Sequence, residues 1–159
     1  MKEKTFQKKI SRHKYQVFIF KSKLPKPVNF ATHSWFVIVK NKKITRWEVY
    51  GHEQKNGKKW GHVYKNSFEP IQGLKKKIFS KKHNNSSIIG KVQGGTDSLA
   101  NKMVNFIEKE SSKYVNAGQF HYVLGPNCNT YVQWVLDRFP ECKIKLPKSA
   151  IGKDYHTEE

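Results

Sequence analysis

The chain has 159 residues, and 31 Lys and Arg against 12 Asp and Glu give a formal net charge of +19. This length fits a single domain with one core, and an aromatic content of 13% is too high for a disordered basic tail. No apolar run reaches the roughly 18–20 residues of a membrane span, and no apolar leader follows the basic start, so we expect neither a membrane span nor a Sec signal. Two cysteines make no disulfide framework, which favours a reducing, cytoplasmic location, although secretion by another route stays open.

The excess of positive charge has two interpretations. A dense positive surface attracts polyanions, so the charge predicts an anionic substrate or surface, with nonspecific nucleic acid among the candidates. The lysines are spread along the whole chain, however, and arginine occurs only at Arg12, Arg46 and Arg138. No zinc-finger spacing or RNA-recognition motif is present. The lysines could therefore also serve only to solvate a small domain.

Five segments rich in β-branched and aromatic residues predict strands in the first part of the chain. They are residues 15–20, 33–40, 44–50, 62–66 and 88–93. The run 33–40 is almost continuously apolar, which is typical of a buried strand. Asn41 to Lys43 then predict a tight turn, so 33–40 and 44–50 should form an antiparallel hairpin.

Helical patterns appear only in the second part of the chain. Thr96 or Asp97 can cap a helix that runs to about Lys113, with apolar residues at helical spacing. Residues 120–124 predict a further strand, and residues 128–138 a second helix. We therefore expect an α+β fold, an antiparallel sheet with two packed helices, in one domain over 1–159. Residues 1–14 form a basic arm that could be flexible, and residues 156–159 a tail.

Residues 125–134, with the sequence Gly-Pro-Asn-Cys-Asn-Thr-Tyr-Val-Gln-Trp, are the most informative stretch. A turn followed by a helix places Cys128 in the first helical turn, where free N–H groups and the helix dipole stabilise a thiolate and can form an oxyanion hole. The alternative is that Cys128 is a small buried apolar residue, a common role of free cysteine. Cys142 follows Pro140 in a charged segment and has no such setting.

A nucleophilic thiol needs a base, and the chain offers seven histidines. His33 stands out because it begins a predicted buried strand, where the backbone is held rigidly. His121, seven residues before Cys128, is the competitor. Either could instead be a structural residue. The sparse histidines and the two cysteines give no zinc-ligand set, so we expect no metal and no cofactor.

Four motifs together resemble an uncharacterised bacterial family known only as a domain of unknown function. They are His33-Ser-Trp, Arg46-Trp-Glu-Val-Tyr-Gly51, Gly125-Pro-Asn-Cys-Asn-Thr-Tyr131 and Leu146-Pro-Lys-Ser-Ala-Ile-Gly-Lys-Asp-Tyr155. More distantly, a histidine on an early strand and Asn-Cys-Asn at a late helix start are similar to the circularly permuted, NlpC-type papain-like superfamily. That superfamily includes lecithin:retinol acyltransferase-like and deSUMOylating-peptidase-like proteins.

The resemblance implies a role for each matching residue. Cys128 would be the nucleophile, His33 the base, and Glu48, on the strand after His33, the residue that orients the imidazole. Glu48 could instead form a salt bridge with a nearby lysine or arginine. In the closer family serine often occupies the position of Cys128, so this position could also be structural, with Asn127, Asn129 and Thr130 capping the helix.

The sequence therefore leaves several functions open. The first is a cysteine hydrolase or acyltransferase that acts on an amide, ester or thioester. The second is a non-catalytic basic module that docks nucleic acid, an anionic membrane or an acidic protein, and the third is a secreted effector or toxin. Lys153 and Asp154 in the last motif could meet substrate, but we favour a packing role for that segment.

Overall fold

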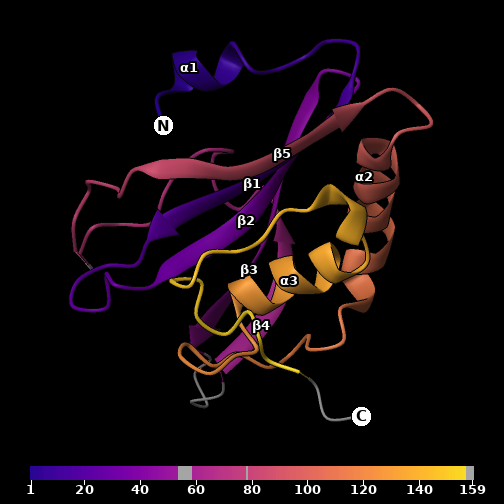
Figure 1. Ribbon diagram of the computed structural model, residues 1–159. Coiled ribbons are helices and arrows are strands. Elements are labelled where there is room, and N and C mark those ends of the chain that lie inside the picture. The colour runs from indigo at the N-terminus through magenta and orange to yellow at the C-terminus, as the bar shows by residue number, and fades with distance from the viewer. Residues whose placement is uncertain (54–58, 78, 157–159) are drawn as a thin grey trace.

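The computed structural model describes residues 1–53, 59–77 and 79–156. A five-stranded antiparallel sheet with the order β4-β3-β2-β1-β5 forms its centre (Figure 1). The strands are β1 (Tyr15–Lys23), β2 (Thr32–Lys40), β3 (Lys43–Glu53), β4 (Lys59–Lys65) and β5 (Ser86–Gly94). Each of the first five predicted strands is present, and the predicted hairpin is formed by β2 and β3, so the α+β class with an antiparallel sheet is confirmed.

Two helices, α2 (Leu99–Glu110) and α3 (Cys128–Asp137), cover one face of the sheet (Figure 1). Apolar residues that alternate along β1, β2 and β3 point toward these helices, as the period of a strand requires. This core includes Val17, Ile19, Phe36, Ile38, Trp47, Met103, Ile107, Tyr131 and Val135. The predicted cap of α2 is wrong, because the side chain of Ser98, rather than Thr96 or Asp97, accepts the N–H of Asn101. The helix ends at Glu110, and residues Ser111–Lys113 continue as a 3-10 turn.

A third, short helix lies against the opposite face of the sheet. It is α1 (Glu3–Gln7), and its Phe6 is completely buried. Phe6 packs in a second core with residues of β1 and β2, namely Phe18, Phe20, Trp35, Val37 and Val39. The basic N-terminal segment is thus held against the sheet by an aromatic side chain, and the described part of the chain has three α-helices rather than the expected two.

The strand predicted at residues 120–124 is wrong, because this segment is an irregular loop and turn. Its backbone bonds are made locally: the N–H of His121 donates to the carbonyl of Pro126, and the N–H of Gly125 donates to the carbonyl of His121. Only Phe120 is buried, with its ring against Gly51 of β3, where a Cβ atom would come within 2.5 Å of the ring. The apolar residues that suggested a strand, Val123 and Leu124, are exposed.

Among the described residues, no helix has both the length and the apolar character needed to cross a bilayer.

Candidate functional site

Cys128 is the first residue of α3, and the turn before it is held by a capping box. The side chain of Asn127 accepts the N–H groups of Asn129 and Thr130, at 2.9 and 3.4 Å, and Thr130 Oγ1 accepts the N–H of Asn127. The N–H of Tyr131 donates to the carbonyl of Asn127. Within the described residues, the N–H of Cys128 is therefore the donor of this first turn that is left without a partner.

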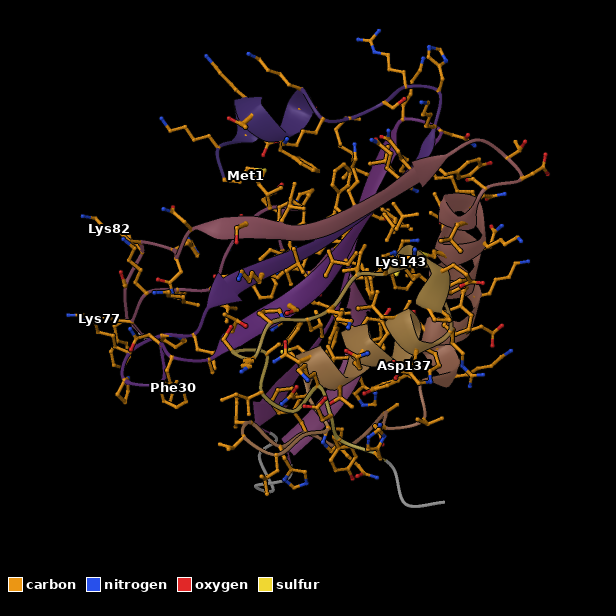
Figure 2. The ribbon with its side chains drawn as sticks, viewed as in Figure 1. Met1, Phe30, Lys77, Lys82, Asp137 and Lys143 are labelled. Atoms are coloured by element: carbon orange, nitrogen blue, oxygen red, sulfur yellow. The ribbon has the colours of Figure 1, made fainter. Side chains whose placement is uncertain are left out.

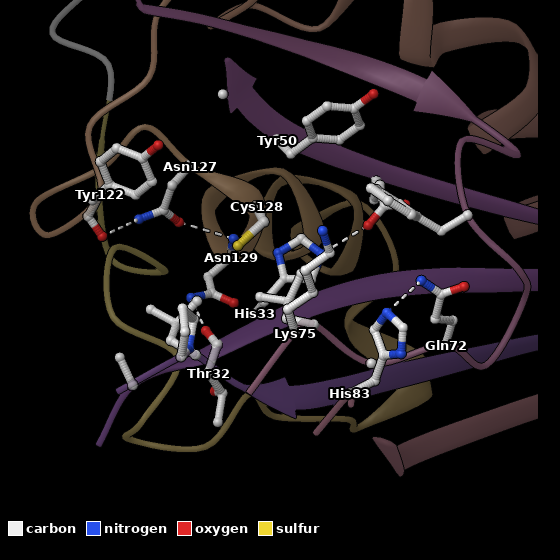
Figure 3. Close-up of a pocket in the computed structure, with 18 of the residues that line it drawn as sticks. Thr32, His33, Tyr50, Gln72, Lys75, His83, Tyr122, Asn127, Cys128 and Asn129 are labelled. Atoms are coloured by element: carbon white, nitrogen blue, oxygen red, sulfur yellow. Dashed lines mark hydrogen bonds and ion pairs between the residues drawn. The ribbon is translucent and has the colours of Figure 1, made fainter. Parts of the chain in front are cut away.

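Two asparagines fix the start of α3 to the rest of the chain (Figure 3). Asn129 Nδ2 donates to the carbonyl of Thr32 at 2.9 Å, so α3 begins beside the first residue of β2. The same amide donates to the carbonyl of Ile151, as does Asn127 Nδ2, at 2.8 and 3.1 Å. These bonds hold Cys128 next to His33, the second residue of β2.

His33 belongs to a buried chain of charged side chains. His33 Nε2 donates to Glu48 Oε2 at 2.8 Å, and Arg46 Nη2 donates to the same oxygen at 2.7 Å. Arg46 Nη1 donates to the carbonyls of Glu69 and Gln72, and its guanidinium lies 4.1 Å from the centre of the Trp35 ring. His33, Arg46 and Glu48 are at most 4% exposed, so these ion pairs are shielded from water.

The charges of these three buried side chains shift one another's pKa values. Burial by itself would lower the pKa of His33, but the charge of Cys128, a hydrogen bond with Cys128 and the Glu48 carboxylate outweigh it and raise the pKa from 6.5 to about 9. Burial would raise the pKa of Glu48, yet its bonds and charge interactions with His33 and Arg46 hold it below 4.5. Burial lowers the pKa of Arg46, although the Glu48 carboxylate opposes this effect.

The thiol and the imidazole lie side by side, with the sulfur turned toward the ring (Figure 3). Because Nε2 of His33 is bound to Glu48, Nδ1 is the ring nitrogen left to interact with Cys128. A carboxylate only accepts hydrogen bonds, so Nε2 carries a proton in both charge states of the ring. Nδ1 is then the position at which the ring can exchange a proton with the sulfur.

A cavity of about 450 Å³ opens at these residues. Cys128, His33 and Glu48 all line it, together with Asn127 and Asn129. Most of the remaining wall is apolar and includes Leu24, Pro25, Phe68, Leu74, Phe120 and Ile151, while Lys75, Lys77 and the hydrogen-bonded pair Gln72 and His83 add polar groups. The described residues contain no cluster of three or more His, Cys, Asp or Glu side chains that could hold a metal ion.

The structure thus brings Cys128, His33 and Glu48 together and leaves three candidates away from them. The side chain of His121 is exposed, and this residue does not line the cavity. Lys153 and Asp154 form an ion pair with each other at 2.5 Å and do not line it either. The nearby carbonyls of Ile151 and Gly152 instead accept hydrogen bonds from α3, so the last motif packs against the helix start.

Sequence reasoning missed the position of Arg46 in this site. From the sequence, the alternative partner of Glu48 is an unspecified nearby lysine or arginine at the surface, whereas in the structure Arg46 is buried and shares Glu48 with His33. Because residues two apart on a strand point to the same face, Arg46 and Glu48 on the predicted strand were a signal for such a pair. Gln72 and His83 lie in irregular segments, where no periodic pattern indicates a site.

A family model described as "Protein of unknown function (DUF3750)" matches residues 14–155, and the chain belongs to this family. The match contains β1 through α3, and therefore also Cys128, His33, Arg46 and Glu48. No curated protein and no solved structure matched the chain.

Proposed function

We propose that the protein is a thiol hydrolase or acyltransferase with a permuted papain-like, NlpC-type arrangement. Cys128 is the nucleophile, His33 the general acid and base, and Glu48 the residue that orients His33. The substrate is an amide, an ester or a thioester. The observation that carries the proposal is the contact of Cys128, at a helix start, with an imidazole whose other nitrogen is bound to a buried carboxylate.

In the first step, the thiolate of Cys128 attacks the carbonyl carbon and forms a tetrahedral oxyanion. The N–H of Cys128 has no partner among the described residues and can donate to that oxyanion. The neighbouring N–H groups of the turn are already bound by the side chains of Asn127 and Thr130. When the carbon–heteroatom bond breaks, the imidazolium of His33 gives its Nδ1 proton to the leaving amine, alcohol or thiol. The acyl group remains on the sulfur as a thioester.

In the second step, water or another acceptor attacks the thioester. Neutral His33 takes the proton of the attacking group at Nδ1, the C–S bond breaks and the thiolate of Cys128 is restored. Glu48 stays ionised throughout, because its contacts with His33 and Arg46 keep its pKa low. Its part is to hold the ring in the productive tautomer and orientation.

Alkylation across pH tests the activated thiol, and Cys142 provides an internal control. Cys128 is 6% exposed and Cys142 is partly buried, and both are free thiols. We expect iodoacetamide to modify Cys128 faster than Cys142 at pH 6, although Cys128 is the less accessible, and His33→Gln to remove this advantage. Modification sites and rates are followed by peptide mass spectrometry. If alkylation of Cys128 rises only as the pH approaches about 8.5, the range of an unperturbed thiol, the proposal is refuted.

An activated ester tests the acyl step directly. With p-nitrophenyl acetate we expect a burst of p-nitrophenolate and an acetyl group on Cys128. The Cys128→Ala variant should lose both signals, and the Cys142→Ser variant should keep both. A burst of equal size in Cys128→Ala would show that another group reacts.

A further inference from the structure

Two loop segments meet at one end of the sheet, away from α2 (Figure 1). One is residues 24–31 between β1 and β2, and the other is residues 74–77 and 79–85 before β5. The N–H of Lys26 donates to the carbonyl of Lys76, and Asn84 Nδ2 donates to the carbonyls of Lys23 and Leu24. The two segments therefore form one surface, which we call the loop surface.

The loop surface is strongly basic. Residues 24–31 and 74–85, together with Lys23 at the adjoining end of β1, contain no Asp or Glu. Their lysines are Lys23, Lys26, Lys75, Lys76, Lys77, Lys81 and Lys82. Figure 2 shows Lys77 and Lys82 extending outward from this end of the molecule.

The same surface exposes large apolar side chains. Phe79 is 98% exposed and Phe30 69%, and Val28 is also exposed. Phe30 lies at the same end as Lys77 and Lys82 (Figure 2), and Phe79 lines a shallow depression with Lys26, Pro27 and Lys77. A phenylalanine that is almost completely exposed has a free-energy cost in water, and a group of such residues marks an interaction surface.

We propose that the loop surface docks on an anionic lipid bilayer. Phe30, Phe79 and Val28 enter the boundary between headgroups and acyl chains, and the surrounding lysines contact the lipid phosphates. Nucleic acid would satisfy the lysines equally well. It would leave the aliphatic side chains of Val28 and Pro27 in water, whereas a bilayer buries them together with the aromatic rings.

Docking in this way would bring the cavity to the bilayer. Leu24, Pro25, Leu74, Lys75 and Lys77 belong both to the loop surface and to the wall of the cavity. The cavity that contains Cys128 would then open beside the lipid headgroups. Docking on the bilayer does not involve the thiol of Cys128, so this proposal does not depend on the proposed thiol chemistry.

Vesicle co-sedimentation of the full chain tests the proposal. We expect binding to vesicles of phosphatidylcholine and phosphatidylserine in equal amounts, and little binding to pure phosphatidylcholine. Replacing Phe30 and Phe79 together by serine should weaken binding by at least about tenfold, since it removes most of the inserted apolar area. Both side chains are exposed, so this variant should keep the wild-type melting temperature.

Charge reversals at two places provide a matched comparison. The double variant Lys77→Glu, Lys82→Glu should lose vesicle binding, because each lysine near an anionic surface contributes about fivefold and each glutamate adds repulsion. The double variant Lys102→Glu, Lys109→Glu changes the net charge equally on the exposed side of α2 and should retain most of the binding. Cys128→Ala should bind as the wild type does.

Three results would overturn the proposal. The first is equal loss of binding from the two charge-reversed pairs, which would indicate attraction by net charge alone. The second is unchanged binding of the Phe30→Ser, Phe79→Ser variant, since insertion would then be absent. The third is binding to duplex DNA at physiological salt without binding to the anionic vesicles, which would assign the loop surface to nucleic acid.

Discussion

Glu48→Gln tests the buried ion network that orients His33. The wild-type carboxylate accepts hydrogen bonds from His33 and Arg46 through a single oxygen, at 2.8 and 2.7 Å, and both ion pairs are buried. Glutamine has nearly the same shape but no charge. The variant would leave the guanidinium of Arg46 in a buried site with neutral partners only, namely the carbonyls of Glu69 and Gln72 and the new amide.

The expected cost is large because the removed partner is buried. Removing one member of a buried ion pair destabilises proteins by about 3–5 kcal/mol, since the remaining charge loses its compensation. A domain of this size has a total free energy of unfolding of about 5–15 kcal/mol, so Glu48→Gln should remove a considerable part of it. The pKa of His33 should also fall from about 9, because the carboxylate is one of the groups that raise it.

Urea unfolding at pH 7 measures the loss as a lower midpoint at an unchanged slope. Glu108→Gln is the matched control. Glu108 also forms a 2.7 Å ion pair, with Lys40, but both side chains are about one-third exposed, and such pairs contribute no more than about 1 kcal/mol. If the two variants lose the same small amount of stability, Glu48 does not compensate a buried charge and the reasoning fails.

Three further predictions concern the protonation of His33 and the anchoring of the two ends of the fold. The contribution of His33 to the free energy of unfolding should be fully present near pH 6 and be lost as the pH rises through about 9, a fall of at most about 3 kcal/mol, because protonated His33 is favoured in the folded state. Cys128→Ala should reduce this fall, as measured by urea titration at several pH values. Asn127→Ala should cost about 1–2 kcal/mol in the same assay and slow alkylation of Cys128, because the cap of α3 is lost, and an unchanged midpoint would contradict the capping role. Phe6→Ala should lower the free energy of unfolding by about 3–5 kcal/mol if α1 is part of the core, whereas a loose arm would tolerate the change.

The strands of the sheet were predictable because their apolar patterns suffice to define them. The run from His33 to Lys40 is buried almost throughout, and the turn after it allows only one hairpin. Residues 120–124 have the same strand-forming composition and nevertheless form a loop. Strand propensity describes the fit of a side chain to a pleated surface, but a strand also needs a partner along its backbone. The hydrogen bonds of His121 and Gly125 are made within the loop itself.

The pairing of His33 with Glu48 could be predicted from the hairpin alone. With Lys40 opposite Lys43 and Phe36 opposite Trp47, continuing the register places Glu48 opposite Trp35, two residues from His33 on the same face. Diagonal neighbours of this kind lie about 7–8 Å apart between their backbones, within reach of a long carboxylate side chain. The approach of Cys128 could not be predicted in this way. It depends on the bond between Asn129 and Thr32, which joins positions 97 residues apart, and no local pattern encodes it.

Arg46 reduces the ability of Glu48 to act as the counter-charge of protonated His33. A carboxylate that served His33 alone would be its natural counter-charge, but Glu48 is already compensated by a buried guanidinium 2.7 Å away. The three side chains Arg46, Glu48 and His33 together carry one net positive charge when His33 is protonated. In a buried site that excess is unfavourable unless a further anion lies nearby, and the group beside the ring is Cys128, whose charge raises the pKa of His33. In the mechanism proposed above, the buried arginine would therefore favour pairing of the imidazolium with the Cys128 thiolate, and the carboxylate would serve mainly to orient the ring.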